Sequence, residues 1–321
     1  MSVRFLRTAA AALSLAAMVA AGSATAADFP TKPVKFVVHA GAGGPIDGAI
    51  RNIAAALEKE AGWKTVVENR PGGGGAVAIA YGLSQPADGY TLISATGSLT
   101  FQLARGTAPF TADDLAFVRT LQGDPCAVLV HKDSPFKTVK DLVAHLKKEP
   151  RSVKMGGFSA GSFQRFIYSQ LQKETGIDAP WIPFDSAKEA SVALLGQHID
   201  VAFFSPSTAV SQIEAGELRV IGIASEERSQ FFPDVPTLKE QGYDIANPFW
   251  RGIVAKKGIP ADVLAKINAD IDTAVAGPDW KAYMNNFKVD SIKIMGEPFA
   301  ELAKKEVADR RDFLREVGLL K

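Results

Sequence analysis

The segment Val34–Pro45 constrains the fold of this chain more than any other part of the sequence. An apolar, β-branched run, Val34–Val38, leads directly into a glycine-rich turn, and the next residues, Gly48–Leu57, have the pattern of a helix. A strand–turn–helix junction aims free backbone N–H groups and the positive end of the helix dipole at one point. That point suits an anion, and a carboxylate and a phosphate would both fit.

Strand-like and helix-like runs alternate along almost the whole chain. The strand-like runs are Val34–Val38, Thr65–Val67, Tyr90–Ala95, Ala127–His131, Val153–Met155, Val201–Phe204 and Val220–Ala224. The helix-like runs between and after them include Ala76–Ser84, Thr138–Lys147, Ser162–Thr175, Pro260–Ala276 and Pro298–Val317. This alternation predicts an α/β fold with mixed, mostly parallel sheets flanked by helices.

Four of the turns that follow strands carry small or hydroxyl residues. They lie at residues 41–46, 96–98, 157–162 and 205–207. Ligands of open α/β sheets bind beyond the carboxyl ends of the strands. Because two of these turns lie early in the chain and two lie in its middle, we predict two lobes whose strand ends face each other across a cleft.

The amino terminus has the pattern of a secretory signal peptide. Arg4 and Arg7 are followed by the apolar run Ala9–Ala21, which is too short to span a bilayer, and Ala24-Thr25-Ala26 forms a cleavage site. We predict that residues 1–26 are removed near Ala26 and that the protein is periplasmic.

The charge and the cysteine content of the chain exclude a nucleic-acid-binding protein and a disulfide-linked fold. Without residues 1–26 the chain carries 34 basic and 35 acidic residues, so we expect no nucleic-acid partner. Cys126 is the single cysteine of an exported chain, which excludes an internal disulfide.

Two partial motifs suggest other functions. Gly41-x-Gly43 with Glu68 resembles a dinucleotide-binding fingerprint, but Ile46 stands at the third glycine position and Pro45 stiffens the turn. Gly157-Phe158-Ser159-Ala160-Gly161 matches a nucleophile elbow, and residues 39–44 resemble an oxyanion-hole loop. A secreted esterase using Ser159 therefore stays an alternative, although only His198 of the four histidines follows Ser159.

No group of histidine, cysteine and acidic residues has metal-ligand spacing, so we expect no metal and no cofactor. Asp47 lies at a helix start, where an acid complements the dipole, and we expect it to shape the turn. Phe158, Phe163 and Phe166 are expected in the core.

Several separated motifs, in one order, cover the mature chain. They are Phe29-Pro30-x-Lys32-Pro33-Val34, Val37-Val38, Gly43-Gly44-Pro45-x-Asp47, Glu68-Asn69-Arg70-Pro71-Gly72-x-Gly74-Gly75, Ala87-Asp88-Gly89-Tyr90-Thr91-Leu92, Asp200-Val201, Ala215-Gly216-x-Leu218-Arg219, Arg228, Pro233-Asp234-Val235-Pro236-Thr237-Leu238-x-Glu240 and Trp250-x-Gly252. In these motifs the chain resembles the substrate-binding proteins of tripartite tricarboxylate transporters, also called the Bug family.

This resemblance implies a type II periplasmic binding fold, with no enzymatic activity, that closes on a small carboxylate and delivers it to membrane permease subunits. By position, the implied binding residues are His39, Ala40, Gly41, Ala42, Gly43, Gly44, Pro45, Thr96, Ser98, Ser159, Gly161, Ser162, Ser205 and Ser207. Backbone amides and hydroxyls can bind a carboxylate by charge-assisted hydrogen bonds. We expect lobe one at residues 28–125 plus 225–321, lobe two at 126–224, and a monomer.

The chain departs from the family pattern at one place. The family has a proline where this chain has His39, and an aromatic residue and two prolines where it has Ala40-Gly41-Ala42. The space freed favours an aromatic dicarboxylate such as terephthalate over citrate or aspartate. Alternatively Phe36, Phe101 or Phe204 refills that volume and leaves a pocket for an aliphatic di- or tricarboxylate.

The motif around Trp250 leaves two roles open. Trp250 either walls the cleft or packs near a hinge. Arg251 is able to pair with a distal carboxylate, but we expect it to be a solvated arginine.

Overall fold

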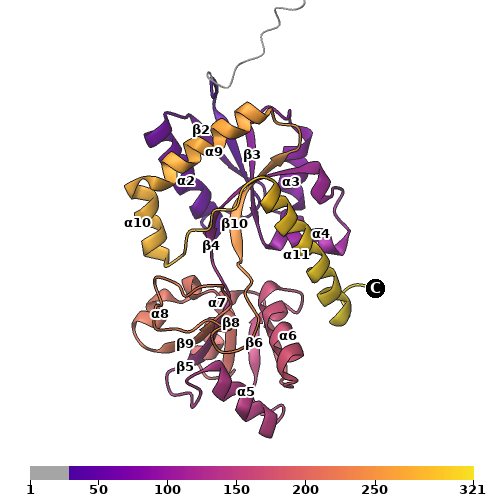
Figure 1. Cartoon of the computed structure of the whole chain (residues 1–321), viewed down its shortest axis with the longest axis vertical. Coiled ribbons are helices and arrows are strands. Elements are labelled where there is room, and N and C mark those ends of the chain that lie inside the picture. Colours follow the sequence, from indigo (N-terminus) through magenta and orange to yellow (C-terminus); the bar gives the residue numbers. More distant parts are fainter. Residues whose placement is uncertain (1–28) are drawn as a thin grey trace, which may run out of the picture.

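The structure, a computed structural model, describes residues 29–321, and the predicted signal peptide at residues 1–26 lies outside them. Two five-stranded sheets, each flanked by helices, lie one above the other along the longest axis of the molecule (Figure 1). The predicted α/β class with two mixed sheets is confirmed. No described helix combines the length and the hydropathy that a membrane crossing requires.

The first sheet has the strand order β2-β1-β3-β10-β4. Its strands are β1 (Val34–Val38), β2 (Thr65–Asn69), β3 (Thr91–Thr96), β4 (Leu115–Gly123) and β10 (Trp250–Lys256). β1 runs parallel to β2 and β3, whereas β10 is antiparallel to β3 and β4.

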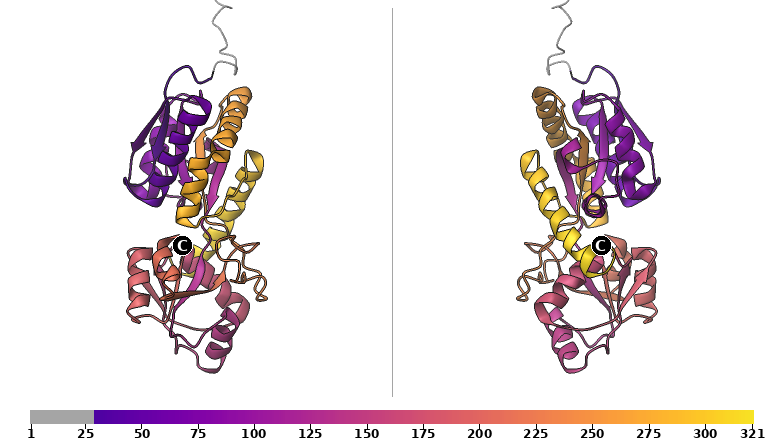
Figure 2. Two further views of the ribbon diagram at one scale, coloured as in Figure 1. Left: turned by 90° about the vertical axis from the view of Figure 1, so that its left-hand side faces the viewer. Right: turned by 90° about the vertical axis from the view of Figure 1, so that its right-hand side faces the viewer.

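Helices cover both faces of the first sheet. They are α2 (Pro45–Ala61), α3 (Ala76–Ser84), α4 (Ser98–Arg105), α9 (Ala261–Ala276), α10 (Pro278–Phe287) and α11 (Glu297–Glu316), with short 3-10 turns η2 (Gly73–Gly75) and η3 (Ala112–Asp114). Successive side chains of a strand point to opposite faces. Phe36 and Val38 accordingly pack with α2 and α9, whereas Val37 packs with α3, α4 and α11. Figure 2 shows this lobe and its helices from two further sides.

The second sheet has the strand order β7-β6-β8-β5-β9. Its strands are β5 (Ala127–His131), β6 (Met155–Phe158), β7 (Trp181–Phe184), β8 (Val201–Phe204) and β9 (Leu218–Ile223). Its helices are α5 (Val139–Lys148), α6 (Phe163–Thr175), α7 (Ala187–Leu195) and α8 (Val210–Glu214), with the 3-10 turn η4 (Pro206–Thr208). In β8, Phe203 packs on the face of α5 and α6, and Phe204 packs on the face of α7.

The chain crosses twice between the sheets, and the two crossings are hydrogen-bonded to each other. The N–H of Asp124 donates to the carbonyl of Phe249 at 2.9 Å, and the N–H of Ala224 donates to the carbonyl of Cys126 at 2.8 Å. The Asp124 carboxylate accepts Nη2 of Arg251 at 2.5 Å. We refer to these adjacent crossings and their shared buried ion pair as the hinge.

Residues 225–249 pack differently from our expectation, which placed them in lobe one. The N–H of Leu238 donates to the carbonyl of Ile223 in β9 at 2.9 Å. Gln241 Oε1 accepts the N–H of Val139, at the start of α5, at 2.8 Å. This segment therefore covers the second sheet, because its apolar residues fill the space beside β9.

The structure also tests the predicted core phenylalanines, secondary-structure elements and helix cap. Phe163 and Phe166 are buried as expected, but Phe158 is 42% exposed, because it lies at the end of β6, beside the cleft. The strands β4, β7 and β10 and the helices α4, α7, α8 and α10 were not predicted from the sequence. The expected cap of α5 is present, since Thr138 and Asp141 form a capping box.

Gly252 in β10 has no room for a side chain. An added Cβ would collide with the backbone oxygen of Arg119 and lie 2.9 Å from the Cα of Thr120. We expect Gly252→Ala to lower the free energy of unfolding by about 1–3 kcal/mol, because the two strands must separate. Gly48→Ala is the control: its Cβ meets nothing within 4 Å inside helix α2, so it raises stability by about 0.5–1 kcal/mol. Denaturant unfolding measures both, and equal midpoints would contradict this packing.

Candidate functional site

The turn after β1 is organised by Asp47, as expected. Asp47 is buried and accepts the N–H of Gly43 at 2.8 Å, Nε of Arg51 at 2.9 Å and Nδ2 of Asn69 at 2.8 Å. Burial raises the pKa of Asp47, but these three hydrogen bonds outweigh it and hold the pKa below 3.8. Because the Gly43 N–H is bound to Asp47, it is not free to bind a ligand.

His39 is held by Ser94 rather than directed at a ligand. Its Nδ1 lies 2.9 Å from the carbonyl oxygen and 2.7 Å from Oγ of Ser94. Burial lowers the pKa of His39 below 6.5, and the nearby Arg251 charge lowers it further, against the Ser94 hydrogen bond. His39 is therefore neutral at pH 7. Together with Thr96 it lines a cavity of only about 10 Å³, room for at most one water.

A much larger cavity, of about 560 Å³, lies between the two lobes. Its walls come from α4 of the first lobe and from the β6–α6 turn of the second, which face each other in Figure 1. The residues that line it are Gly73, Gly74, Ser98, Phe101, Gln102, Arg105, Thr107, Phe158, Ser159, Gly161, Ser162, Phe163, Gln164 and Phe249. Its size is typical of small-molecule sites.

The structure distributes the predicted site residues over three places. Those that line the large cavity are Ser98, Ser159, Gly161 and Ser162. Those that line the small one are His39 and Thr96. Those at the hinge are Ser205, whose Oγ donates to the Asp124 carbonyl at 2.7 Å, and Ser207, whose Oγ donates to the Asp124 carboxylate at 2.8 Å.

The rest of the predicted glycine-rich turn lines neither cavity. It comprises Ala40, Gly41, Ala42, Gly43, Gly44 and Pro45. The carbonyl of Ala40 accepts Nδ2 of Asn69 at 3.0 Å, and Gly44 is the N-cap of α2. This turn is therefore fixed mainly by its own contacts with α2 and β2.

The amino terminus of α6 forms one wall of the large cavity. Ser162 caps this helix, since its Oγ accepts the N–H of Arg165 at 3.2 Å. The same hydroxyl donates to the carbonyl of Ser159, which has a positive φ of 41°. The first N–H groups of a helix have no partner within the helix, and the dipole makes this end positive. The wall formed by Ser162, Phe163 and Gln164 thus suits a carboxylate.

The cavity combines one charge with several aromatic rings. Among its described lining residues Arg105 is the one charged side chain, and its Nη2 donates to the carbonyl of Gly161 at 3.3 Å. Four phenylalanines line the same space, and the rings of Phe163 and Phe249 are 4.9 Å apart. Sequence reasoning missed Arg105, because no motif connects the end of α4 with the β6–α6 turn.

Arg251 and Trp250 lie away from the large cavity. Arg251 is buried against Asp124, so the expectation of a solvated arginine is wrong. The reason is topological: β10 enters the sheet directly from the hinge. Trp250 is fully buried and donates Nε1 to Glu306 at 3.0 Å. It packs near the hinge and does not wall the cleft.

The partial motifs have structural roles. All four histidines lie within the described residues, and none is hydrogen-bonded to Ser159; His39 binds Ser94 and His145 binds Ser152. Glu68, the acid of the dinucleotide pattern, is paired with Lys35 at 3.0 Å and with Arg70.

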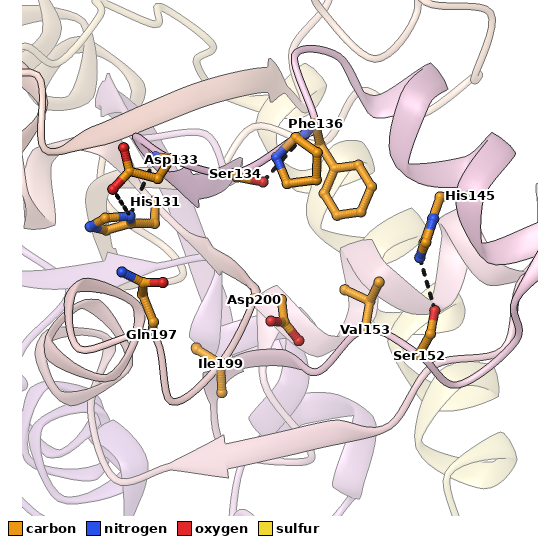
Figure 3. Close-up of a pocket in the computed structure, with 11 residues that line it drawn as sticks. His131, Asp133, Ser134, Phe136, His145, Ser152, Val153, Gln197, Ile199 and Asp200 are labelled. Atoms are coloured by element: carbon orange, nitrogen blue, oxygen red, sulfur yellow. Dashed lines mark hydrogen bonds and ion pairs between the residues drawn. The ribbon is translucent and has the colours of Figure 1, made fainter.

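A third cavity, of about 270 Å³, lies in the second lobe at the end of β5 that is remote from the hinge (Figure 3). His131 lies 3.5 Å from Asp133, and His145 Nε2 lies 3.0 Å from Ser152 Oγ. Within residues 29–321 no group of three or more histidine, cysteine or acidic side chains is arranged to hold a metal ion.

Two mixed sheets joined by a double crossing, with a cavity between them, define a two-lobed solute-binding protein of type II. Residues 49–319 match the family described as the tripartite tricarboxylate transporter family receptor. The chain belongs to this family.

The alignments with individual relatives cover most of this chain and most of each relative. The UPF0065 protein in the gbd 5'region of Cupriavidus necator is 30% identical over 98% of this chain and 96% of its own. A TctC solute binding protein from Polaromonas, solved with no ligand, has a TM-score of 0.82 at 27% identity over 90% of this chain and 99% of its own. MatC from Rhodopseudomonas palustris, solved with bound malate, has a TM-score of 0.68 at 25% identity over 89% of this chain and 100% of its own.

The low pKa of Asp47 gives a pH-dependent prediction. A depressed pKa in the folded state contributes stability above the unfolded pKa, and this contribution is lost as the pH falls through the folded value. We expect Asp47→Asn to lower the Tm at pH 7, because the Arg51 ion pair is lost. The difference from the parent protein narrows as the pH falls below 3.8. Thermal unfolding between pH 7 and pH 2.5 measures this difference in Tm, and Asp113→Asn, at an exposed position, is the control. A difference in Tm that does not change with pH would contradict the lowered pKa of Asp47.

Proposed function

We propose that this protein is a periplasmic receptor that binds a small carboxylate in the cavity between its lobes and delivers it to the permease subunits of a tripartite transporter. The observation that carries this proposal is the cavity itself. It offers the positive end of α6, several hydroxyls and the Arg105 guanidinium, and none of its described lining residues is acidic. Membership of the receptor family and the malate bound to MatC support a carboxylate ligand.

Binding without catalysis is part of the proposal. Ser159 lies at the cavity, but it has no histidine beside it to take its proton, and acyl transfer by a serine needs such a base. Ser159 is therefore a binding residue of the turn that precedes α6.

We propose an aromatic dicarboxylate, with terephthalate as the example, ahead of an aliphatic di- or tricarboxylate. Because residues 40–42 line neither cavity, the aromatic character of the large cavity comes from other residues: Phe36 and Phe204 are buried in the lobe cores, and Phe101 lines the cavity. Phe101, Phe163 and Phe249 present rings to the space, and such rings stack with an aromatic ligand. The malate of MatC supports the aliphatic alternative.

We also propose the lobe assignment. Lobe one comprises residues 29–124 and 250–321, and lobe two comprises residues 125–249, because the two crossings lie at these places. Closure about the hinge buries the ligand between the lobes. Export with cleavage near Ala26 and a monomeric state complete the proposal.

A thermal-shift screen tests carboxylate binding. A ligand that binds only the folded protein stabilises it by about 2.7 kcal/mol at one hundred times its Kd, which corresponds to a rise in Tm of about 5 °C or more. We expect this rise with terephthalate, and smaller rises with adipate and malate. An unchanged Tm with every mono-, di- and tricarboxylate would refute the proposal, and tight citrate binding without a response to terephthalate would reject the aromatic ligand.

Ser159→Ala separates binding from catalysis. Removing one hydroxyl from the cavity wall weakens carboxylate binding by about tenfold at most, since a single hydrogen bond is lost. We expect no hydrolysis of a chromogenic ester by the parent protein or by the variant. Ester hydrolysis that the substitution abolishes would establish the esterase instead.

A further inference from the structure

Arg105 is a cation without an anionic partner at the mouth of the cavity. It is the last residue of α4, and its side chain is exposed. Within residues 29–321 no carboxylate lies within ion-pair distance of its guanidinium, whose recorded hydrogen bond goes to the carbonyl of Gly161. An arginine fork binds a carboxylate through two parallel hydrogen bonds, and one neutral acceptor uses only part of it.

The residues around Arg105 make this corner of the cavity positive. Gly161 directly precedes Ser162, the N-cap of α6, so the guanidinium lies beside the positive end of that helix. Two features of different kinds, a side-chain charge and a set of helix N–H groups, therefore act on the same volume. Both favour an anionic group.

The other polar residues that α4 contributes to the cavity carry no charge. Ser98 begins α4, and Gln102, which lies one turn before Arg105 and is 8% exposed, donates Nε2 to the carbonyl of Gly73 at 2.7 Å. The Gln102 Oε1 is buried without a donor among the described residues. Since α4 has eight residues at about 1.5 Å each, the two ends are separated by about 10 Å. Phenylalanine rings line the same cavity.

From this arrangement we infer that the cavity selects solutes with two carboxylates on an apolar spacer, and that Arg105 pairs with one of them. The spacer lies among Phe101, Phe163 and Phe249, and the other carboxylate lies at the amino terminus of α4. This inference rests on the proposed carboxylate-binding function and adds the residue that distinguishes a dicarboxylate from a monocarboxylate.

A purely structural role of Arg105 makes a different prediction. Its hydrogen bond to Gly161 joins the two lobes, so loss of the side chain would also loosen closure. Loosened closure weakens the binding of every ligand by the same factor, because each pays the same conformational cost. Loss of an ion pair weakens the binding only of those ligands that carry the second carboxylate.

The experiment compares matched ligands by calorimetry on the mature protein. Terephthalate is paired with benzoate and adipate is paired with hexanoate, so that each pair differs in one carboxylate. We expect Arg105→Gln to raise the Kd for the better-binding dicarboxylate by about tenfold to a hundredfold and to leave the Kd of its monocarboxylate within about twofold. Arg105→Lys keeps the charge and recovers part of the affinity. Arg151→Gln, which removes an exposed ion pair with Asp178, is the control, and we expect it to change neither the Kd for the dicarboxylate nor the Kd for the monocarboxylate.

The outcomes separate this inference from the proposed function. Suppose that the parent protein binds the dicarboxylates. If Arg105→Gln then weakens the binding of both ligands of a pair equally, or of neither ligand, the role of Arg105 is refuted while the proposed function stands. If the parent protein binds no carboxylate, the function itself fails. Parent binding that does not distinguish terephthalate from benzoate, or adipate from hexanoate, also overturns the inference.

Discussion

The carboxylate of Asp124 connects parts of the chain that are far apart in sequence. It binds Arg251, 127 residues away, and Ser207, 83 residues away, while its own carbonyl accepts Ser205. All of these groups are buried or nearly so, and removing one partner of a buried ion pair typically costs about 3–5 kcal/mol. Both crossings between the sheets pass this point. The relative placement of the two lobes, and hence the cavity between them, depends on this cluster.

The cavity has the chemistry of an anion site, although it holds few charges. Helix N–H groups and hydroxyls bind a carboxylate without the desolvation cost of a buried cation. Behind the cavity wall, Arg310 is buried with its guanidinium 3.8 Å from the ring centre of Phe166 and 5.2 Å from that of Phe101. Burial raises the pKa of its neighbour Glu306, although the charge of Arg310 opposes this shift. Arg310 thus packs against Phe101 of the cavity wall and against Phe166 behind it.

Much of the fold was predictable, but less of the site was, since of the fourteen residues that line the large cavity only Ser98, Ser159, Gly161 and Ser162 were predicted. Periodicity located β1, β3, β5 and most helices, because period two and period 3.6 are local properties. The β6–α6 turn was predicted because glycine and serine residues between a strand and a helix are typical of a ligand-binding turn. In the turn after β1, Asp47 accepts the N–H of Gly43 and Asn69 donates to the carbonyl of Ala40, and the sequence does not reveal these contacts. Arg105, Gln102 and Phe249 were missed because they belong to no shared motif.

The sequence alone determined the class of the protein: alternating strands and helices, an acid at the start of α2 and several spaced motifs that need no partner elsewhere in the chain. These are short-range features, set by hydrogen bonding and burial within a few residues. Only the tertiary structure decided which turns share a cavity, that Arg251 is buried at the hinge and that Arg105 reaches the β6–α6 turn. Those contacts join segments more than fifty residues apart, and chain topology, rather than local preference, brings them together.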